Sequence, residues 1–407
     1  FYDGDTSNNV HCWEDTKAKN PDSDPAWRGD FQGLIDKLDY IKAMGFSAIW
    51  ITPVVENASG YDYHGYHALN FMKVDPRYES EGATYQDLID AAHAKGLKII
   101  QDVVFNHTGN FGESNLFPMF EKDESNLGSS DCMEEVSNSG LPSNYSSLNP
   151  DAQYQARLSR MKEDANDTNN IYHHEKSLQW ESYLEQTGQI AGDCVDLNTE
   201  NPEVSKYLVD AYTKYINMGV DGFRIDTVKH ISRLTWNNDL LPQLQAAGGD
   251  DFTMFGEVCT RVRSVWNRDI PALSAPFFTW KETESYPWGD TKTNEASTKK
   301  HYQDHSNVSN EPTSTNAFLN GNEYHTPDYS QRSHLDMIDF TMHWNFDYAR
   351  NAFQKGLEED KYYNDSTWNV VYVDSHDYVP NTDDRYDGGT DNWAENLDLM
   401  FTFRRIP

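Results

Sequence analysis

The sequence lacks long hydrophobic runs and is poor in basic residues. None of its apolar stretches approaches the ~18–20 residues that a helix needs to cross a membrane, so we expect no membrane span. Its 33 lysines and arginines stand against 66 aspartates and glutamates, which gives a formal net charge of −33. Because a polyanion repels phosphate backbones and anionic lipid, neither nucleic acid nor a membrane surface is an expected partner.

The excess of acidic residues has two interpretations. One is solubility, with some of the carboxylates binding cations. The other is adaptation to salt, which would screen the self-repulsion of the chain. Composition does not separate the two.

Cysteine is scarce as well. Cys12, Cys132, Cys194 and Cys259 are far apart, and no C-x-x-C motif occurs. This spacing argues against cysteine-rich metal clusters and thioredoxin-like redox motifs. An even number of cysteines permits two disulfides in a secreted protein, with three possible pairings, but free buried thiols fit equally well.

The pattern that is present is an alternation of amphipathic helices and short apolar strands. Glycines at 45, 96 and 219 separate a helix from the strand that follows it. Such repeated βα units predict an α/β fold with a parallel sheet. We expect strands over 46–55, 97–105, 220–228, 252–258, 335–342 and 368–376, and helices over 31–44, 84–95, 202–218, 232–247, 346–357 and 391–403.

The alternation stops between residues 107 and 195, a polar segment rich in Ser, Asn and Asp. A segment of this length between a strand and the next helix is typical of an inserted subdomain or a functional excursion. We therefore divide the chain into a first catalytic part (1–106), an insertion (107–195) and a second catalytic part (196–407).

Polar side chains follow four of the expected strands. Asn106, Asp226, Glu257 and Asp377 lie at or just past the carboxyl ends of these strands, the edge where α/β proteins bind ligands. Glycoside hydrolysis needs one protonated and one ionised carboxyl group. Arg224, two residues from Asp226 along the strand, is expected to keep Asp226 ionised, whereas burial is expected to raise the pKa of Glu257.

Four motifs contain or adjoin these residues: DVVFNH (102–107), GFRIDTVKH (222–230), GEV (256–258) and VDSHD (373–377). In this order they resemble the α-amylase family, glycoside hydrolase family 13, over nearly the whole chain. The resemblance implies a (β/α)8 TIM barrel with a domain inserted after the third strand. It also implies a retaining mechanism in which Asp226 is the nucleophile, Glu257 the acid/base and Asp377 a transition-state stabiliser. In a retaining enzyme the carboxyls of Asp226 and Glu257 should lie ~5–5.5 Å apart.

The same resemblance assigns sugar-binding roles to further positions and implies bound Ca²⁺. The substrate-binding set is His64, Tyr66, His107, Arg224, Lys229, His230 and His376. One calcium site would use Asn106, Asp196 and the backbone carbonyl of His230, oxygen ligands that suit Ca²⁺. A second site would use Asp3, Asp5, Asn8, Asn9 and Asp30, although clusters of Asp, Asn and Gly are also common in turns that bind no metal.

The sequence departs from the family pattern at several places. Tyr378 follows Asp377 where most members have Asn, which argues against a chloride site there. The first barrel strand should precede Phe1 and the eighth should begin near Ile406, so we expect the chain to be clipped at both ends and to lack the C-terminal β-sandwich.

The resemblance leaves the specificity of the enzyme partly open. TVKH (227–230) and Val258 favour endo-acting cleavage of α-1,4 bonds in starch and maltooligosaccharides, by a secreted or cell-surface monomer. A transglycosylase or an oligosaccharide-cleaving glucosidase or neopullulanase would share the catalytic residues. A non-catalytic glucan-binding homologue fits poorly, because all three carboxylates are present.

Overall fold

A computed structural model describes residues 2–8, 29–58, 64–127, 132–163, 166–179, 182–259, 274–306, 328–376 and 392–407. The chain divides into two compact units. The first consists of Phe1–Leu178, Thr187–Arg224 and Gln243–Phe252, and the second of Gln179–Gln186, Ile225–Pro242 and Thr253–Pro407. None of the helices within the described ranges combines the length and apolar character needed to cross a membrane.

The first unit is built on the strand order β1-β4-β9. β1 (Ala48–Ile51) pairs in parallel with β4 (Lys98–Val104), and β9 (Gly222–Asp226) begins in this unit and ends in the second. The side chains of β4 and β9 are almost all buried, as expected of parallel strands covered on both faces.

The helices of the first unit begin and end at recognisable caps. α6 (Pro202–Met218) begins after Asn201, whose side chain accepts a hydrogen bond from the Glu203 amide, and ends at Gly219 with φ of 105°, a left-handed conformation that favours glycine. α3 (Tyr85–Ala94) begins with a capping box of Thr84 and Asp87. α1 (Phe31–Ile35) and α2 (Leu38–Ala43) precede β1.

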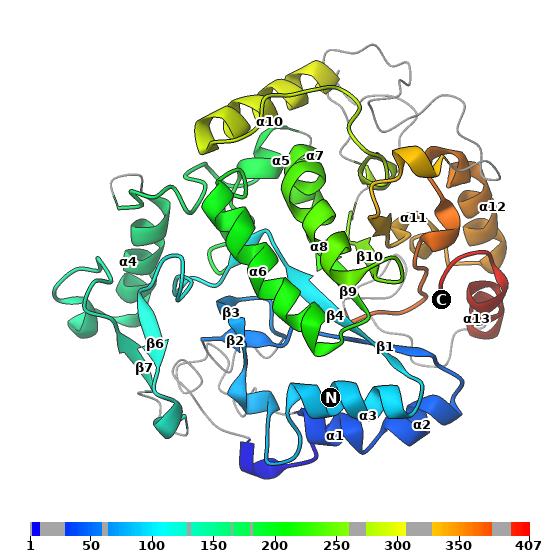
Figure 1. Ribbon diagram of the computed structural model, residues 1–407, viewed down its shortest axis with the longest axis horizontal. Coiled ribbons are helices and arrows are strands. Elements are labelled where there is room, and N and C mark those ends of the chain that lie inside the picture. Colours follow the sequence, from blue (N-terminus) through cyan, green and yellow to red (C-terminus); the bar gives the residue numbers. More distant parts are fainter. Residues whose placement is uncertain are drawn as a thin grey trace. The chain divides into compact units, whose positions relative to one another are not determined.

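Two antiparallel pairs adjoin the insertion. β2 (Val55–Asn57) pairs with β3 (Ala68–Val74). β5 (His107–Thr108) pairs with β8 (Val195–Asp196), so the two ends of the segment 107–195 lie side by side. Between them, the hairpin of β6 (Phe120–Lys122) and β7 (Met133–Glu135) lies beside α4 (Pro150–Lys162) (Figure 1).

In the second unit, β10 (Thr253–Gly256) and β11 (Asp336–Met337) follow β9 in the strand order of the sheet. β10 pairs in parallel with β11, and isolated parallel bridges join Ile338 to Val370 and Val370 to Ile406. The other elements are α5 (Leu184–Thr187), α7 (Arg233–Thr235), a π-helix (Trp236–Leu240), α8 (Leu241–Gly248), α9 (Ala275–Phe278), α10 (Thr291–Ser306), α11 (Phe340–His343), α12 (Ala349–Glu359) and α13 (Trp393–Thr402).

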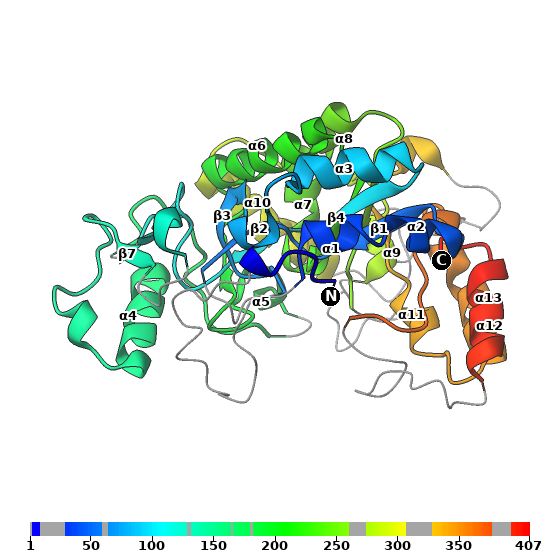
Figure 2. The ribbon, with the colours of Figure 1, turned by 90° about the horizontal axis from the view of Figure 1, so that it is seen from below.

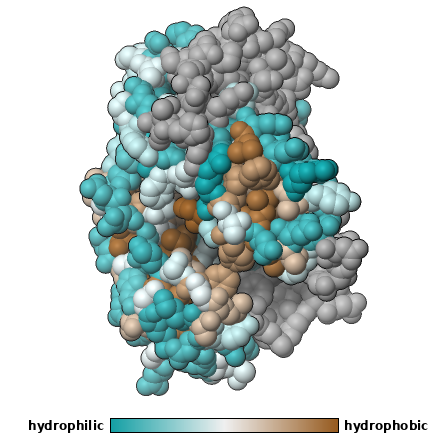
Figure 3. Space-filling model, turned by 90° about the vertical axis from the view of Figure 1, so that its right-hand side faces the viewer, coloured by the Kyte–Doolittle hydropathy of each residue, from teal (hydrophilic) through white to brown (hydrophobic). Residues whose placement is uncertain are grey.

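Within the second unit α12 and α13 lie side by side (Figure 2). Both helices pack on an apolar cluster of Met342, Phe346, Ala352, Val371, Val373 and Phe403; α12 contributes Ala352, and α13 packs Trp393, Leu397, Leu399 and Met400 against the cluster. Their outer faces keep some large apolar side chains exposed, including Phe353, Leu357 and Phe401. Figure 3 views the molecule from the right-hand side of Figure 1 and shows hydrophobic residues gathered among hydrophilic ones.

Three expected elements differ from the structure. The strand expected over 335–342 ends at Met337, because the Asp339 side chain accepts a hydrogen bond from the Met342 amide and begins α11. The helix expected over 31–44 is interrupted at Asp36 and Lys37, which separate α1 from α2. The strand expected over 368–376 is reduced to the bridges at Val370.

Candidate active site

In the first unit the centre of the site is Asp102 on β4. Its carboxylate is fully buried and accepts hydrogen bonds from Trp50 Nε1 at 3.1 Å, Tyr66 Oη at 2.8 Å and Arg224 Nη1 at 3.0 Å. Burial raises the pKa of Asp102 to about 6, although Arg224, Tyr66 and Trp50 oppose the shift. The Arg224 guanidinium also lies 5.3 Å from the centroid of the Trp50 ring. These contacts fix Arg224 and Tyr66 in one arrangement.

The predicted sugar-binding histidines of the first unit lie next to Tyr66. His64 stacks on the Tyr66 ring with centroids 5.5 Å apart, and its Nδ1 accepts a hydrogen bond from the Tyr66 amide. His107, which is 2% exposed, lies on β5 with its Nε2 3.1 Å from the Tyr66 carbonyl oxygen. The structure therefore brings His64, Tyr66 and His107 together.

In the second unit the two candidate catalytic carboxylates lie at the ends of neighbouring strands. Asp226 ends β9 and is 8% exposed, and Glu257 directly follows β10 and is half-buried. Glu257 Oε2 accepts a hydrogen bond of 3.3 Å from the amide of Thr227, the residue next to Asp226. Thr227 adopts φ of 51°, a left-handed conformation that is rare for a β-branched residue and concentrates at functional sites.

The two predicted leaving-side residues follow directly. Lys229 Nζ donates a hydrogen bond to the Cys259 carbonyl oxygen at 3.1 Å and lies 3.5 Å from Glu185 Oε1. His230 Nδ1 lies 2.8 Å from the backbone oxygen of Glu185. Both side chains are therefore held in place by backbone oxygens and by α5.

The last motif is only partly described by the structure. His376 lies in an exposed turn after Val370. Asp377 and the unusual Tyr378 lie outside the described residues, so the assignment of Asp377 as the third carboxylate stays a prediction.

Two of the expected calcium ligands, Asn106 and Asp196, lie in contact. Asn106 Nδ2 donates to Asp196 Oδ1 at 3.0 Å, and His173 Nδ1 lies 2.7 Å from Asp196 Oδ2. Glu200 is 3.2 Å from the other His173 nitrogen. Although burial lowers it, these two carboxylates raise the pKa of His173 to about 10. The amide and carboxylate suit Ca²⁺, but a bound ion would compete with the His173 cation for Asp196.

The N-terminal cluster converges on Asp30. The Asp30 carboxylate accepts hydrogen bonds from the amides of Gly4, Asp5 and Gly33, at 2.9, 2.9 and 2.7 Å. Asn8 Nδ2 also donates to Asp30, but its buried Oδ1 has no hydrogen-bond partner among the residues that the structure describes. A hard cation binds oxygen atoms of this kind, so the loop fits a bound Ca²⁺. Asn9 lies outside the described residues.

Sequence reasoning missed several residues that hold the site. Asp102 lies inside the motif DVVFNH, but nothing in a single sequence showed that Trp50 and Arg224 would meet it. The thiol of Cys194 interacts with His107 and His67. Burial raises the pKa of this thiol, but the two histidines outweigh burial and lower the pKa to about 7. No local pattern signals such a contact, because the residues are far apart in the chain.

Cysteine usage is now partly defined. Cys132 is disulfide-bonded, whereas Cys194 and Cys259 are thiols that form no disulfide. Both of the alternatives that the sequence left open, disulfides and free thiols, therefore occur in the same chain.

Comparison with known proteins places these features in a family. Residues 1–385 match the family model described as "Alpha amylase, catalytic domain". A beta/alpha-amylase of Paenibacillus polymyxa is 35% identical over 234 residues, which cover 57% of this chain and 16% of the relative. An alpha-amylase of Streptomyces lividans is 31% identical over 293 residues, which cover 64% of this chain and 30% of the relative. The chain thus spans less than a third of either curated relative.

Among solved structures, the cyclomaltodextrin glucanotransferase CldA superposes with a TM-score of 0.59 at 21% identity, covering 100% of this chain and 68% of that one. This similarity supports the fold, and the expected fold class, an α/β fold of the (β/α)8 type, is confirmed. The chain belongs to the α-amylase catalytic-domain family, whose members are glycoside hydrolases and related glucanotransferases.

Proposed function

We propose that this protein is a retaining endo-hydrolase that cleaves α-1,4-glucosidic bonds in starch and maltooligosaccharides. The observation that supports it most directly is the contact between Glu257 and the Thr227 amide, next to Asp226. Two carboxyl groups at the ends of adjacent strands match what double displacement on a glycosidic bond needs.

In this proposal each residue has a separate role in the reaction. Asp226 attacks the anomeric carbon, while Glu257 protonates the leaving oxygen and then removes a proton from the attacking water. In the first unit, the Asp102 carboxylate holds Arg224 and Tyr66, and His107 and His64 contact sugar hydroxyls. Lys229 and His230 contact the leaving side, and Asp377 stabilises the transition state.

The second candidate function is transglycosylation, because the relatives of this chain include cyclomaltodextrin glucanotransferases. Incubation with maltoheptaose distinguishes a hydrolase from a transferase. The two share the covalent intermediate and differ only in the acceptor, which is water for the hydrolase and a sugar for the transferase. We expect maltose, maltotriose and maltotetraose as early products, with the new reducing end released in the α-configuration. Cyclic or longer products would instead identify a transferase, and a β-configured product would contradict a retaining mechanism.

We also propose that Ca²⁺ binds this chain in the N-terminal loop and beside Asn106 and Asp196. Asn8 Oδ1, which has no partner within the described part of the chain, supports the first site, and the buried Asn106–Asp196 pair supports the second. The carbonyl of His230 is the third ligand proposed for the second site. The ion would neutralise acidic groups and stiffen both loops.

Calcium is therefore expected to raise the thermal midpoint of unfolding. Saturation at a hundred times Kd stabilises a protein by about 2.7 kcal/mol, so EGTA should lower the midpoint by several degrees. In Asn8→Ala the increment between calcium and EGTA should shrink, whereas Asn126→Ala, at an exposed position, should retain it. An increment that is unchanged in Asn8→Ala would argue against the N-terminal site.

Three further properties follow as proposals. The disulfide at Cys132 supports secretion or a cell-surface location, since disulfides persist in oxidising compartments. We propose that residues 107–195 form the inserted domain B between catalytic parts 1–106 and 196–407. We also propose that the protein acts as a monomer.

A further inference from the structure

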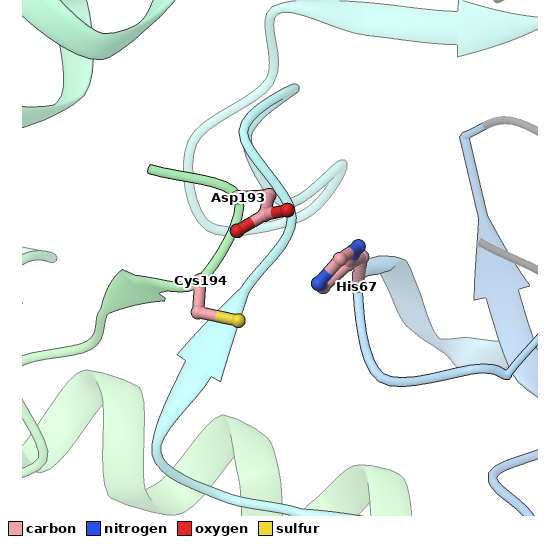
Figure 4. Close-up of side chains that lie close together, drawn as sticks. All are labelled: His67, Asp193 and Cys194. Carbon is pink, nitrogen blue, oxygen red and sulfur yellow. The ribbon is translucent and has the colours of Figure 1, made fainter. Parts of the chain in front are cut away.

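A histidine, an aspartate and a cysteine outside the proposed catalytic machinery lie together in the first unit. One potential ligand atom from each of His67, Asp193 and Cys194 lies within 4.8 Å of the other two. Figure 4 shows the three side chains directed toward a common space. His67 directly precedes β3, and Asp193 and Cys194 directly precede β8.

The backbone holds both sides of this cluster in place. The His67 amide donates to Asn57 Oδ1 at 2.8 Å, and the His67 carbonyl packs so closely on Gly109 that a Cβ there would lie 2.8 Å from its oxygen. Cys194 adjoins the β8 ladder, which pairs with β5. His67 is 9% exposed, and Asp193 and Cys194 are half-buried, so an ion can reach the cluster from solvent.

The donor set selects a class of ion. A thiolate with an imidazole and a carboxylate prefers a borderline ion such as Zn²⁺ over Ca²⁺, which takes oxygen ligands. At bond lengths of about 2.0–2.3 Å, the ligand atoms of a tetrahedral zinc lie roughly 3.3–3.8 Å apart. Side-chain rotations that move the ligand atoms by about an ångström would therefore close the cluster around a metal. Three protein ligands leave a fourth position open.

We propose that His67, Asp193 and Cys194 form a binding site for a divalent metal of the zinc class, and that its occupation inhibits the enzyme. Binding releases the Cys194 thiol proton to solvent as the metal–sulfur bond forms. The inhibition, which rests on the proposed function, follows from the position of His107: it pairs with Asp196, two residues after Cys194, in the β5–β8 ladder. A metal on the Cys194 sulfur would offer the nearby His107 its open position, which withdraws His107 from the sugar.

The binding part is tested by titrating the full chain with Co²⁺ in saturating Ca²⁺, without thiol reductants. We expect one equivalent of Co²⁺ to produce a thiolate charge-transfer band in the near ultraviolet, and Zn²⁺ to displace it. Cys194→Ser should abolish the band and weaken Zn²⁺ binding more than about tenfold, at least as much as the loss of an outer-shell partner. Cys259→Ser, which removes the other free thiol, should leave both unchanged.

A second pair of variants tests the role of the His67 imidazole as a metal ligand. His67→Asn should weaken Co²⁺ binding, whereas His93→Asn, at an exposed histidine paired with Asp221, should not. Circular dichroism establishes that each variant is folded. Absence of a band in the parent protein, or a band that persists in Cys194→Ser, would overturn the site.

The inhibitory part is tested separately on maltoheptaose. Zn²⁺ should inhibit the parent protein, a zinc-selective chelator should restore activity, and Cys194→Ser should resist inhibition. Binding without inhibition would overturn the coupling to His107 and leave the metal site standing. A metal-free protein without activity would count against the proposed function alone, because absorption reports binding independently.

Discussion

Replacing Asp226 with asparagine is expected to reduce turnover of maltoheptaose by roughly four orders of magnitude, the scale seen when a nucleophilic group is removed. The substitution keeps the shape of the side chain and removes the negative charge that attacks the anomeric carbon. Because the carboxylate contributes little to ground-state binding, starch affinity should stay within a few fold. Steady-state kinetics and a starch co-sedimentation assay measure the two effects.

The control for this prediction lies at the other end of the same strand. Asp221 directly precedes β9 and binds His93 and the Ile99 amide, so Asp221→Asn should retain most of the activity. For Asp226→Ala, added azide should restore part of the turnover and give a glucosyl azide of inverted configuration, since azide fills the space of the missing nucleophile. Activity of Asp226→Asn within tenfold of the parent would contradict the assignment.

The second large effect is expected at Asp75, which is fully buried just after β3. Its carboxylate accepts hydrogen bonds from Arg77 Nε and Nη2, each at 2.9 Å, and from the Asn57 amide at 3.0 Å. Lys122 Nζ of β6 lies 3.6 Å away. Asp75 thus joins the β2–β3 pair to a strand of the insertion.

Asp75→Asn is expected to lower the free energy of unfolding by about 3–5 kcal/mol, because it removes the buried negative charge that Arg77 and Lys122 face. Urea denaturation followed by tryptophan fluorescence measures the change. The same substitution in the exposed Lys206–Asp210 pair, Asp210→Asn, should cost less than about 1 kcal/mol. Equal effects at the two positions would refute the role given to Asp75.

The effect should depend on pH in a defined direction. Burial raises the pKa of Asp75, but Arg77 and Lys122 outweigh it and hold the pKa well below its usual range. A carboxylate with a lowered pKa in the folded state stabilises the protein above its unfolded pKa of about 3.9, and this contribution is lost as the pH falls toward the folded value. The difference between parent and Asp75→Asn should therefore be constant above about pH 5 and shrink only in stronger acid.

The sequence was most informative where local signals agreed. The helix expected over 202–218 is α6 with the same bounds, because Asn201, Pro202 and Gly219 each specify a boundary. The strands β4, β9 and β10 were recognisable from short apolar runs, and the catalytic candidates from their place at the ends of these runs. Periodicity, caps and motifs all act over a few residues, so a single sequence carries them.

The sequence was least informative where one residue changes the local outcome or where distant residues meet. LDMIDFTM reads as a strand, yet Asp339 caps α11 within it. The strand β3 was not expected, because its register is set by pairing with β2. Likewise His67 and Cys194 meet only through the fold, and nothing near either residue in the chain indicates the other.

The two-residue ladder between His107 and Asp196 has a consequence for how this protein can diverge. Once β5 and β8 have paired, the segment between them is a closed loop, and each doubling of its length adds only about 0.6 kcal/mol of closure entropy. Insertions and deletions within 109–194 are therefore tolerated on entropic grounds as long as the ladder survives. Natural variation in length should concentrate in this segment, while His107 and Asp196 keep their register.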